Sequence, residues 1–269
     1  MNNFWQRLLT GSLFVLIIFA SIFYGPLSFQ ILFFLVAMLS LNEFYTIVKN
    51  DQRQPNIALG MISGATIYIV MSGMLADYFK LNINTVIYPV TTLIFLAELY
   101  RKKSEPFTNI AFTLIGIIYA VLPFVLLNKI STHAQQYDAG IVGGYFILLW
   151  SSDTFAYIFG NLLGKTKLFE RISPKKSWEG SIGGGISALI AAWILWHYNP
   201  QLSLVNWIVI ALIIVIAGTF GDLTESMLKR SLSVKDSGSL LPGHGGMLDR
   251  FDGLLLSVPF VWTYLSIFC

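Results

Sequence analysis

The sequence has little cysteine, little histidine and little charge, and each shortage excludes a class of protein. Its one cysteine, Cys269, cannot form an internal disulfide, and its three histidines are too scattered in sequence to predict a zinc site. Only 12% of the 269 residues are charged, about half the share of a soluble domain, whereas 55% are hydrophobic. A mean hydropathy of +0.69 favours a chain that lies largely within a membrane.

Long apolar stretches fill most of the chain. Each is close to the length of about 20 residues that a transmembrane helix needs, and none alternates as a membrane β-strand does. The predicted fold is therefore all-α, a polytopic integral membrane protein with about nine transmembrane helices. The predicted spans cover residues 8–24, 27–48, 57–76, 82–99, 107–127, 140–160, 181–198, 203–221 and 252–268.

The basic residues are distributed unequally between the connections. With the amino terminus in the cytoplasm, fifteen of the seventeen Lys and Arg residues lie on the cytoplasmic side, and only Lys80 and Lys129 lie outside. Positive charge is retained in the cytoplasm, so this asymmetry predicts a multi-pass protein of the cell membrane with a cytoplasmic amino terminus. We expect about five spans in residues 1–139, and about four spans with two cytoplasmic loops in residues 140–269.

The second of these loops, around residues 222–251, is unusually acidic. If the eighth span continues as a helix into the cytoplasm, Asp222, Ser226 and Lys229 share one face, and Glu225 is displaced from it. Asp249 and Asp252 are three residues apart and share a face of the next helix. Carboxylates beside Lys and Arg suit Mg²⁺ held between protein and phosphate oxygens. The alternative is a charge network at the membrane interface.

Glycines lie between these acidic residues. Gly243, Gly245 and Gly246 permit positive φ and close backbone approach, as loops that cradle phosphate require. His244, among them, is interpreted as a structural donor in preference to a catalytic base, because no neighbour marks it as activated.

The first loop, around residues 161–180, is basic and leads into the seventh span. Ser173, Lys175 and Lys176 precede a predicted helix amino terminus, where free amide groups attract an anion. This pattern predicts phosphate binding. The alternative is that the lysines only set the topology or contact anionic lipid. The glycines that follow, Gly183 to Gly185, lie within the predicted helix and indicate close helix packing.

Two further acidic residues lie in or near predicted spans. Asp153 is within the sixth span, and an ionisable residue at that depth is a candidate for lining a site, with a hydrogen-bonded packing role as the alternative. Glu43 is near the inner end of the second span and is interpreted as interfacial.

At these residues the sequence closely resembles the phosphatidate cytidylyltransferases, also called CDP-diacylglycerol synthases. The family's upstream element is matched from Ile172 to Gly184, and its Gly-Asp pair by Gly221 and Asp222. The resemblance covers the carboxyl-terminal half and makes residues 140–269 the catalytic region. The family's signature, with every spacer kept, is matched by Ser226, Lys229, Arg230, Lys235, Asp236, Pro242, His244, Gly245, Gly246, Asp249, Arg250 and Asp252.

The resemblance implies transfer of a cytidylyl group from CTP to phosphatidic acid in the lipid membrane, with CDP-diacylglycerol and pyrophosphate as products. It implies Mg²⁺ held by Asp222, Asp249 and Asp252, a monovalent cation (K⁺), a homodimer and no nucleic-acid partner. The residues expected to be catalytic are Asp222, Asp249, Lys229 and Arg230. Those expected to bind substrate are Asp153, Ser173, Lys175, Lys176, Ser226, Lys235, His244 and Arg250.

Two other functions remain open at this point. A CTP-dependent lipid kinase of the polyprenol or phytol type would transfer the γ-phosphate to an alcohol, but the full signature disfavours it. A transporter would place its charges near the midplane of broken helices, whereas the acidic residues here gather at the predicted cytoplasmic rim.

Overall fold

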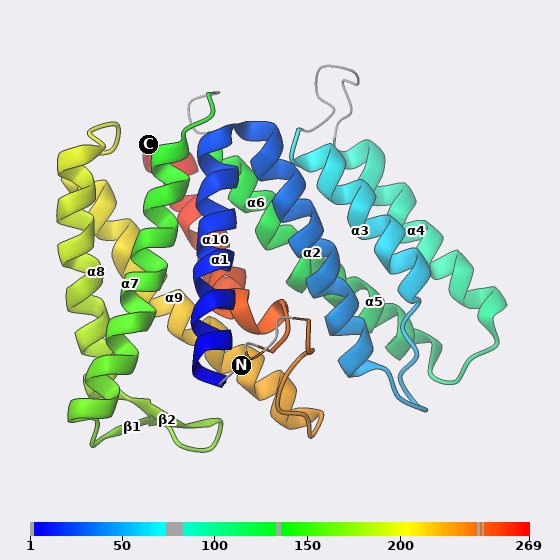
Figure 1. Cartoon of the computed structure of the whole chain (residues 1–269). Helices are drawn as coiled ribbons and strands as arrows, with labels where there is room; N and C mark the ends of the chain where they lie inside the picture. Colours follow the sequence, from blue (N-terminus) through cyan, green and yellow to red (C-terminus); the bar gives the residue numbers. More distant parts are fainter. Residues whose placement is uncertain (1–2, 74–82, 133–135, 241–242, 244) are drawn as a thin grey trace. The chain divides into compact units, whose positions relative to one another are not determined.

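The computed structural model describes residues 3–73, 83–132, 136–240, 243 and 245–269 (Figure 1). Helices make up most of these residues. In the amino-terminal half they are α1 (Asn3–Tyr24), α2 (Pro26–Val48), α3 (Ile57–Met71), α4 (Ile83–Arg101), α5 (Pro106–Ala120) and α6 (Leu122–Ser131). In the carboxyl-terminal half they are α7 (Ala139–Leu163), α8 (Trp178–Tyr198), α9 (Leu204–Ser231) and α10 (Leu248–Phe268).

Each predicted span overlaps a helix, but one span is interrupted. The predicted segment 107–127 is divided into α5 and α6 at Val121, two residues before Pro123. Proline has no amide hydrogen and its ring clashes with the carbonyl four residues earlier, so the helix cannot continue unchanged. The helical character of the chain is confirmed, and the break is a detail that hydrophobicity alone does not indicate.

Six helical segments among the described residues are long and apolar enough to cross a membrane. The apolar part of α1, Leu9–Tyr24, and α3 are shorter. The structure therefore supports a helical membrane protein, while the count of nine spans and the side on which the amino terminus lies stay predictions. The six segments are α2, α5 together with α6, α7, α8, α9 and α10.

The first predicted loop is not wholly irregular. It contains a two-stranded antiparallel hairpin of β1 (Lys167–Phe169) and β2 (Ser173–Ser177), in which Lys167 is opposite Ser177 and Phe169 is opposite Ser173. The all-α prediction is therefore wrong for these few residues. This connection is not helical, so its backbone N–H and C=O groups have no helical partners, and pairing of the two strands supplies hydrogen bonds to them.

Among the described residues, polar side chains cap the amino termini of four helices. Each lies at the residue before its helix and accepts a hydrogen bond from an amide of the first turn, which would otherwise have no partner within the helix. These caps fix where α3, α7, α8 and α9 start. The four residues are Asn56, Asp138, Ser177 and Ser203.

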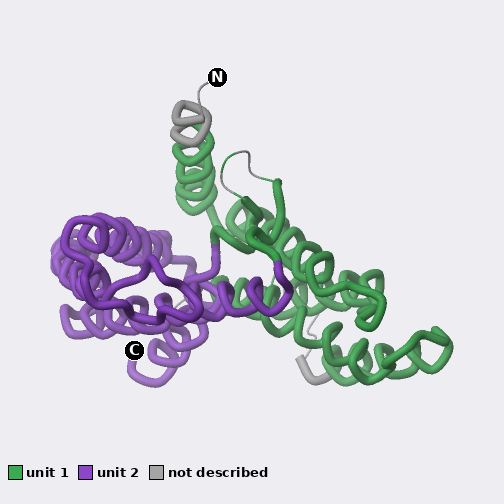
Figure 2. Tube along the Cα trace, turned by 90° about the horizontal axis from the view of Figure 1, so that it is seen from below, with its two compact units in different colours: residues 1–128, 234–250 green, residues 129–233, 251–269 purple. Residues whose placement is uncertain are grey.

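The chain forms two compact units, shown in different colours in Figure 2. The first unit comprises residues 1–128 and 234–250, and the second comprises residues 129–233 and 251–269. The sequence alone places a boundary near residue 139 and keeps residues 234–250 with the carboxyl-terminal half. In the structure those residues belong with the amino-terminal helices.

The first unit is organised around α2, which packs against α1, α3 and α5. The Tyr45 side chain is fully buried, and its hydroxyl donates a 2.7 Å hydrogen bond to the carbonyl of Thr113. A Cβ atom at Gly60 would lie 2.7 Å from the Tyr45 ring, and one at Gly116 would lie 2.5 Å from it. The two glycines therefore make the space in which the tyrosine ring sits.

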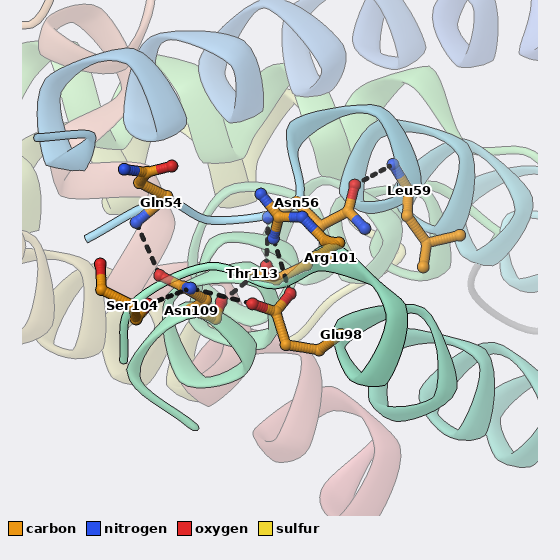
Figure 3. Close-up of polar contacts among 8 residues, drawn as sticks. All are labelled: Gln54, Asn56, Leu59, Glu98, Arg101, Ser104, Asn109 and Thr113. Carbon is orange, nitrogen blue, oxygen red and sulfur yellow. Dashed lines mark hydrogen bonds and ion pairs between the residues drawn. The ribbon is translucent and has the colours of Figure 1, made fainter. Parts of the chain in front are cut away.

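A polar cluster of the same unit joins α4 and α5 to the segment after α2 (Figure 3). The Asn109 amide donates to Glu98 at 2.9 Å and to the carbonyl of Ser104 at 2.8 Å, and its oxygen accepts from the Gln54 amide at 2.6 Å. Arg101 pairs with the buried Glu98 at 2.6 Å. Glu98 is thus compensated by both a charge and a hydrogen bond, as a buried carboxylate requires.

The second unit is built on a close contact between α7 and α8, with α9 packed against both. A Cβ atom at Gly184 would lie 2.6 Å from the carbonyl oxygen of Ser152, and one at Gly180 would lie 2.7 Å from that of Ala156. Gly183 faces the Phe159 ring. The predicted packing role of the glycine run is confirmed for Gly183 and Gly184.

We expect Gly184→Ala to destabilise the protein by about 1–3 kcal/mol, the usual cost of overfilling a packed contact. Gly185→Ala is the matched control, since a Cβ atom there meets nothing closer than Val215 at 3.7 Å. Thermal unfolding of the detergent-solubilised variants measures the difference. An equal effect of the two substitutions would show that the α7–α8 contact does not depend on the missing Cβ.

Candidate active site

Asp222 lies at the centre of a charged cluster in the second unit. Its carboxylate is 2.6 Å from the Lys176 ammonium, which comes from β2 and also donates to the carbonyl of Thr219 at 3.4 Å. The Ser226 hydroxyl donates to the other Asp222 oxygen at 3.2 Å. The helical continuation of α9 predicted from the sequence is confirmed, and it places Asp222 and Ser226 on one face. The contact with Lys176 joins this face to the basic first loop.

Two more carboxylates belong to this cluster. Asp153 of α7 and Asp252 of α10 both lie within electrostatic range of Asp222 and of Lys176. Asp252 accepts a 2.7 Å hydrogen bond from the amide of Gly253. Asp222 is thus the carboxylate in contact with the Lys176 ammonium, and the carboxyl groups of Asp153 and Asp252 lie near this pair.

The approach of α10 to α9 depends on Gly221. A Cβ atom at Gly221 would collide with the carbonyl of Asp252 and would lie 3.0 Å from the Cα atom of Gly253. The absence of a side chain at the residue before Asp222 therefore lets α10 come close enough to bring Asp252 beside it. This explains in physical terms why glycine precedes the aspartate.

Asp249 belongs to the first unit and has different partners. Its Oδ2 atom accepts hydrogen bonds from the amides of Ser237, at 3.0 Å, and Gly246, at 2.8 Å. Its carboxylate therefore orders the connection that precedes α10. Joint metal binding by Asp222 and Asp249 stays a prediction from the resemblance.

The glycine-rich stretch before α10 takes the backbone conformation predicted for it at two positions. Gly243 has φ +79° and Gly245 has φ +82°, in the region that favours glycine. A Cβ atom at Gly245 would also lie 2.8 Å from Asp249 Oδ2. His244 lies outside the described residues, so its assignment stays a prediction.

Lys229 pairs with Glu225, a residue that the sequence pattern does not place on the predicted face of α9. Its ammonium is 2.5 Å from the carboxylate of Glu225, which is only 1% exposed. Glu225 lies one helical turn before Lys229 and could be found as an i, i+4 ion pair. The predicted column along α9 therefore joins Asp222 to Ser226, while Lys229 is held by Glu225.

The first loop holds its own ends together. The Ser177 hydroxyl caps α8 by accepting from Gly180 at 3.2 Å, and the Glu179 carboxylate accepts from the amides of Lys165 and Thr166 at 3.1 Å. Ser173 lies half-buried in β2, and the Lys175 side chain is exposed beside the inward Lys176. The remaining predicted basic residues have exposed side chains: Arg230, Lys235 and Arg250.

The cluster around Asp222 can act on charged groups. Carboxylate oxygens accept a hard cation, and the lysine offers a donor to an anion. Among the residues that the structure describes, no group of three or more His, Cys, Asp or Glu side chains is arranged to hold a metal ion alone. Any ion bound here would need further oxygen ligands.

The chain is similar to known proteins over nearly its whole length. The pattern that defines the Cytidylyltransferase family matches residues 5–268. A phosphatidate cytidylyltransferase of Bacillus subtilis is 32% identical over 98% of both chains. One of Rickettsia typhi is 35% identical over 82% of this chain and 96% of its own, and one of Haemophilus influenzae is 42% identical over 58% of this chain and 55% of its own.

We expect Lys176→Met to lower the thermal stability of the protein by about 1 kcal/mol, the upper part of the range for partly exposed ion pairs. The substitution leaves Asp222 facing Asp153 and Asp252 without a counter-charge. Lys175→Met is the control and should leave the unfolding midpoint unchanged.

A double variant tests whether Asp222 is the partner of Lys176. Adding Asp222→Asn to Lys176→Met should recover part of the lost stability. Without its charge, residue 222 no longer needs the Lys176 ammonium and no longer repels Asp153 and Asp252. Additive losses in the double variant would contradict the pairing.

Proposed function

Because this chain belongs to the cytidylyltransferase family, we propose that it transfers the cytidylyl group of CTP to phosphatidate and so forms CDP-diacylglycerol and pyrophosphate. The observation that carries the proposal is the contact between Lys176 and Asp222. These residues come from the two separate sequence elements that resemble the phosphatidate cytidylyltransferases. Their meeting in one cluster is what a shared active site requires.

In the proposed reaction an oxygen of the lipid phosphate attacks the α-phosphorus of CTP. The new P–O bond forms as the bond from the α-phosphorus to the bridging oxygen breaks, and pyrophosphate leaves with the electron pair. No covalent intermediate with the protein is needed. The main barrier is repulsion between two anions, so the protein's contribution is to place positive charge and to orient the reacting groups.

The basic residues of the second unit suit that task. Lys175 lies on β2 and Arg230 lies on α9, the elements that also carry Lys176 and Asp222. Both side chains are exposed, so they can contact phosphate groups without breaking the ion pair of Asp222. Lys176 has a different part, since it already neutralises Asp222. We propose that Lys176 moves its hydrogen bonds to a phosphate oxygen when CTP binds.

The donor set fits magnesium, which proteins usually bind through one or two carboxylates together with substrate phosphates. Asp222 and Asp252 would hold it from the second unit, and we keep Asp249 as a third proposed ligand. When bound, the ion would neutralise charge on the phosphates. A monovalent cation and a homodimer are proposed from the resemblance alone.

We further propose that the β1–β2 hairpin and the connection between α9 and α10 face the cytoplasm. The support is the excess of Lys and Arg on one predicted side of the membrane. CTP is a cytoplasmic nucleotide and too charged to cross a bilayer unaided, so a site that uses it must open on that side.

The test of the function is a label-transfer assay with purified protein and phosphatidate in mixed micelles. CTP labelled at the α-phosphate should give labelled lipid, and CTP labelled at the γ-phosphate should give none. Asp222→Asn should reduce transfer on the order of 10²-fold or more, whereas Asp51→Asn, at an exposed site of the first unit, should not. In a parallel assay with a polyprenol or phytol in the micelles, lipid label from the γ-position would identify a kinase. No transfer from either position to any of these lipids would leave the transporter as the remaining alternative.

The orientation is tested by cysteine labelling in intact cells. In a Cys269→Ser background, Ser239→Cys and Glu170→Cys lie at exposed positions and should react only with a membrane-permeant reagent. The natural Cys269 is exposed at the far end of α10 and should react with an impermeant reagent from outside. Reaction of Ser239→Cys with the impermeant reagent would overturn the proposed orientation.

A further inference from the structure

Glu43 of α2 binds a segment that lies about two hundred positions later in the chain. Its Oε1 atom accepts a 2.8 Å hydrogen bond from the amide of Met247, and its Oε2 atom accepts one of 2.8 Å from the amide of Leu248. The Ser237 hydroxyl donates to Oε2 at 3.1 Å. All of these residues belong to the first unit (Figure 2).

The position of Glu43 suits a carboxylate. Met247 and Leu248 are at the start of α10, where amides have no partner within the helix and the helix dipole favours negative charge. Glu43 is 9% exposed, so water does not replace these contacts readily. A glutamine of the same size has one acceptor oxygen and would turn an amino group toward one of the donors.

Two glycines let the segment close over the carboxylate. A Cβ atom at Gly238 would lie 2.9 Å from the Glu43 carboxyl carbon, and one at Gly246 would collide with both Ser237 and Glu43. Gly246 belongs to the signature that resembles the cytidylyltransferases. Its lack of a side chain is therefore explained, in this structure, by the approach to Glu43.

The same segment is held a second time by Asp249. The amides of Ser237 and Gly246 donate to Asp249 Oδ2, while the Ser237 hydroxyl donates to Glu43. Ser237 thus connects the two carboxylates, and Gly246 lies between them. A displacement of the segment at Glu43 would also displace the donors that orient Asp249.

We propose that Glu43 is a positioning residue for the cytidylyl transfer, which it serves by holding residues 237–248 and through them Asp249. The proposal rests on the proposed function and on the assignment of Asp249 to the site. Glu43 is not proposed to touch CTP, lipid or metal. The sequence reading of Glu43 as an interfacial charge accounts for its place near the helix end but not for its buried partners.

The test compares Glu43→Gln with Glu98→Gln. Glu98 is the matched control because it is a buried glutamate of the same unit, and its side chain bonds to Arg101 and Asn109 and not to residues 234–250. Amide hydrogen exchange of peptides covering residues 236–249 reports the segment without any substrate. We expect faster exchange there in Glu43→Gln and wild-type exchange in Glu98→Gln.

The kinetic readout separates positioning from stability. Misplacing a reacting group by about an ångström can slow a reaction on the order of 10²-fold. We therefore expect kcat for CDP-diacylglycerol formation to fall by about that factor in Glu43→Gln, at temperatures where the variant remains folded, with a smaller change in KM for CTP. Glu98→Gln should keep wild-type kcat at such temperatures.

The double variant and a milder substitution complete the design. Glu43→Gln with Asp249→Asn should be little slower than Asp249→Asn alone, since both act through one group. If Glu43→Gln does not fold, Ser237→Ala, which removes one of the three bonds, should show the same two effects at lower amplitude.

Wild-type exchange and kcat in either variant at position 43 or 237 would overturn the proposal. A wild-type protein that does not transfer the α-phosphate would refute the proposed function, while the exchange comparison would still decide whether Glu43 holds the segment.

Discussion

Close backbone contact at glycine is the constraint on which the second unit depends. Between helices in lipid there is little hydrophobic gain from association, so packing and hydrogen bonds must hold them together. Gly180 and Gly184 bring α8 against the carbonyls of α7, and Gly221 brings α9 against α10. The charged cluster exists because these backbones approach. With a side chain at Gly221, Asp222 and Asp252 would be held further apart.

The charged cluster stabilises the folded protein and, in the proposed function, also binds the ligands. The Lys176 ammonium pairs with the partly exposed Asp222, and the carboxyl groups of Asp153 and Asp252 lie near the same pair. In the proposed reaction, a cation accompanied by phosphate groups would balance these carboxylates and would give the lysine an alternative partner.

Most of the helices could be predicted from the sequence, because an apolar run of membrane length has few alternatives to a helix in lipid. The break at Val121 had a visible signal in Pro123, but the β1–β2 hairpin had none in hydrophobicity. Within the site, Asp222 and Ser226 follow from helical periodicity, since they are four residues apart. Lys176 and Asp222 are far apart in sequence, and only the folded arrangement of β2 and α9 brings them together.

The contacts of Glu43 have a consequence for how the protein can vary. Its two shortest bonds come from the backbone amides of Met247 and Leu248, and every residue except proline supplies the same donor. Substitutions at 247 and 248 can therefore accumulate without altering the contact, and no compensating change at 43 would accompany them. Statistical coupling between these positions would be weak even though they touch. The selective constraint would fall instead on position 43 itself and on the two glycines that make room for it.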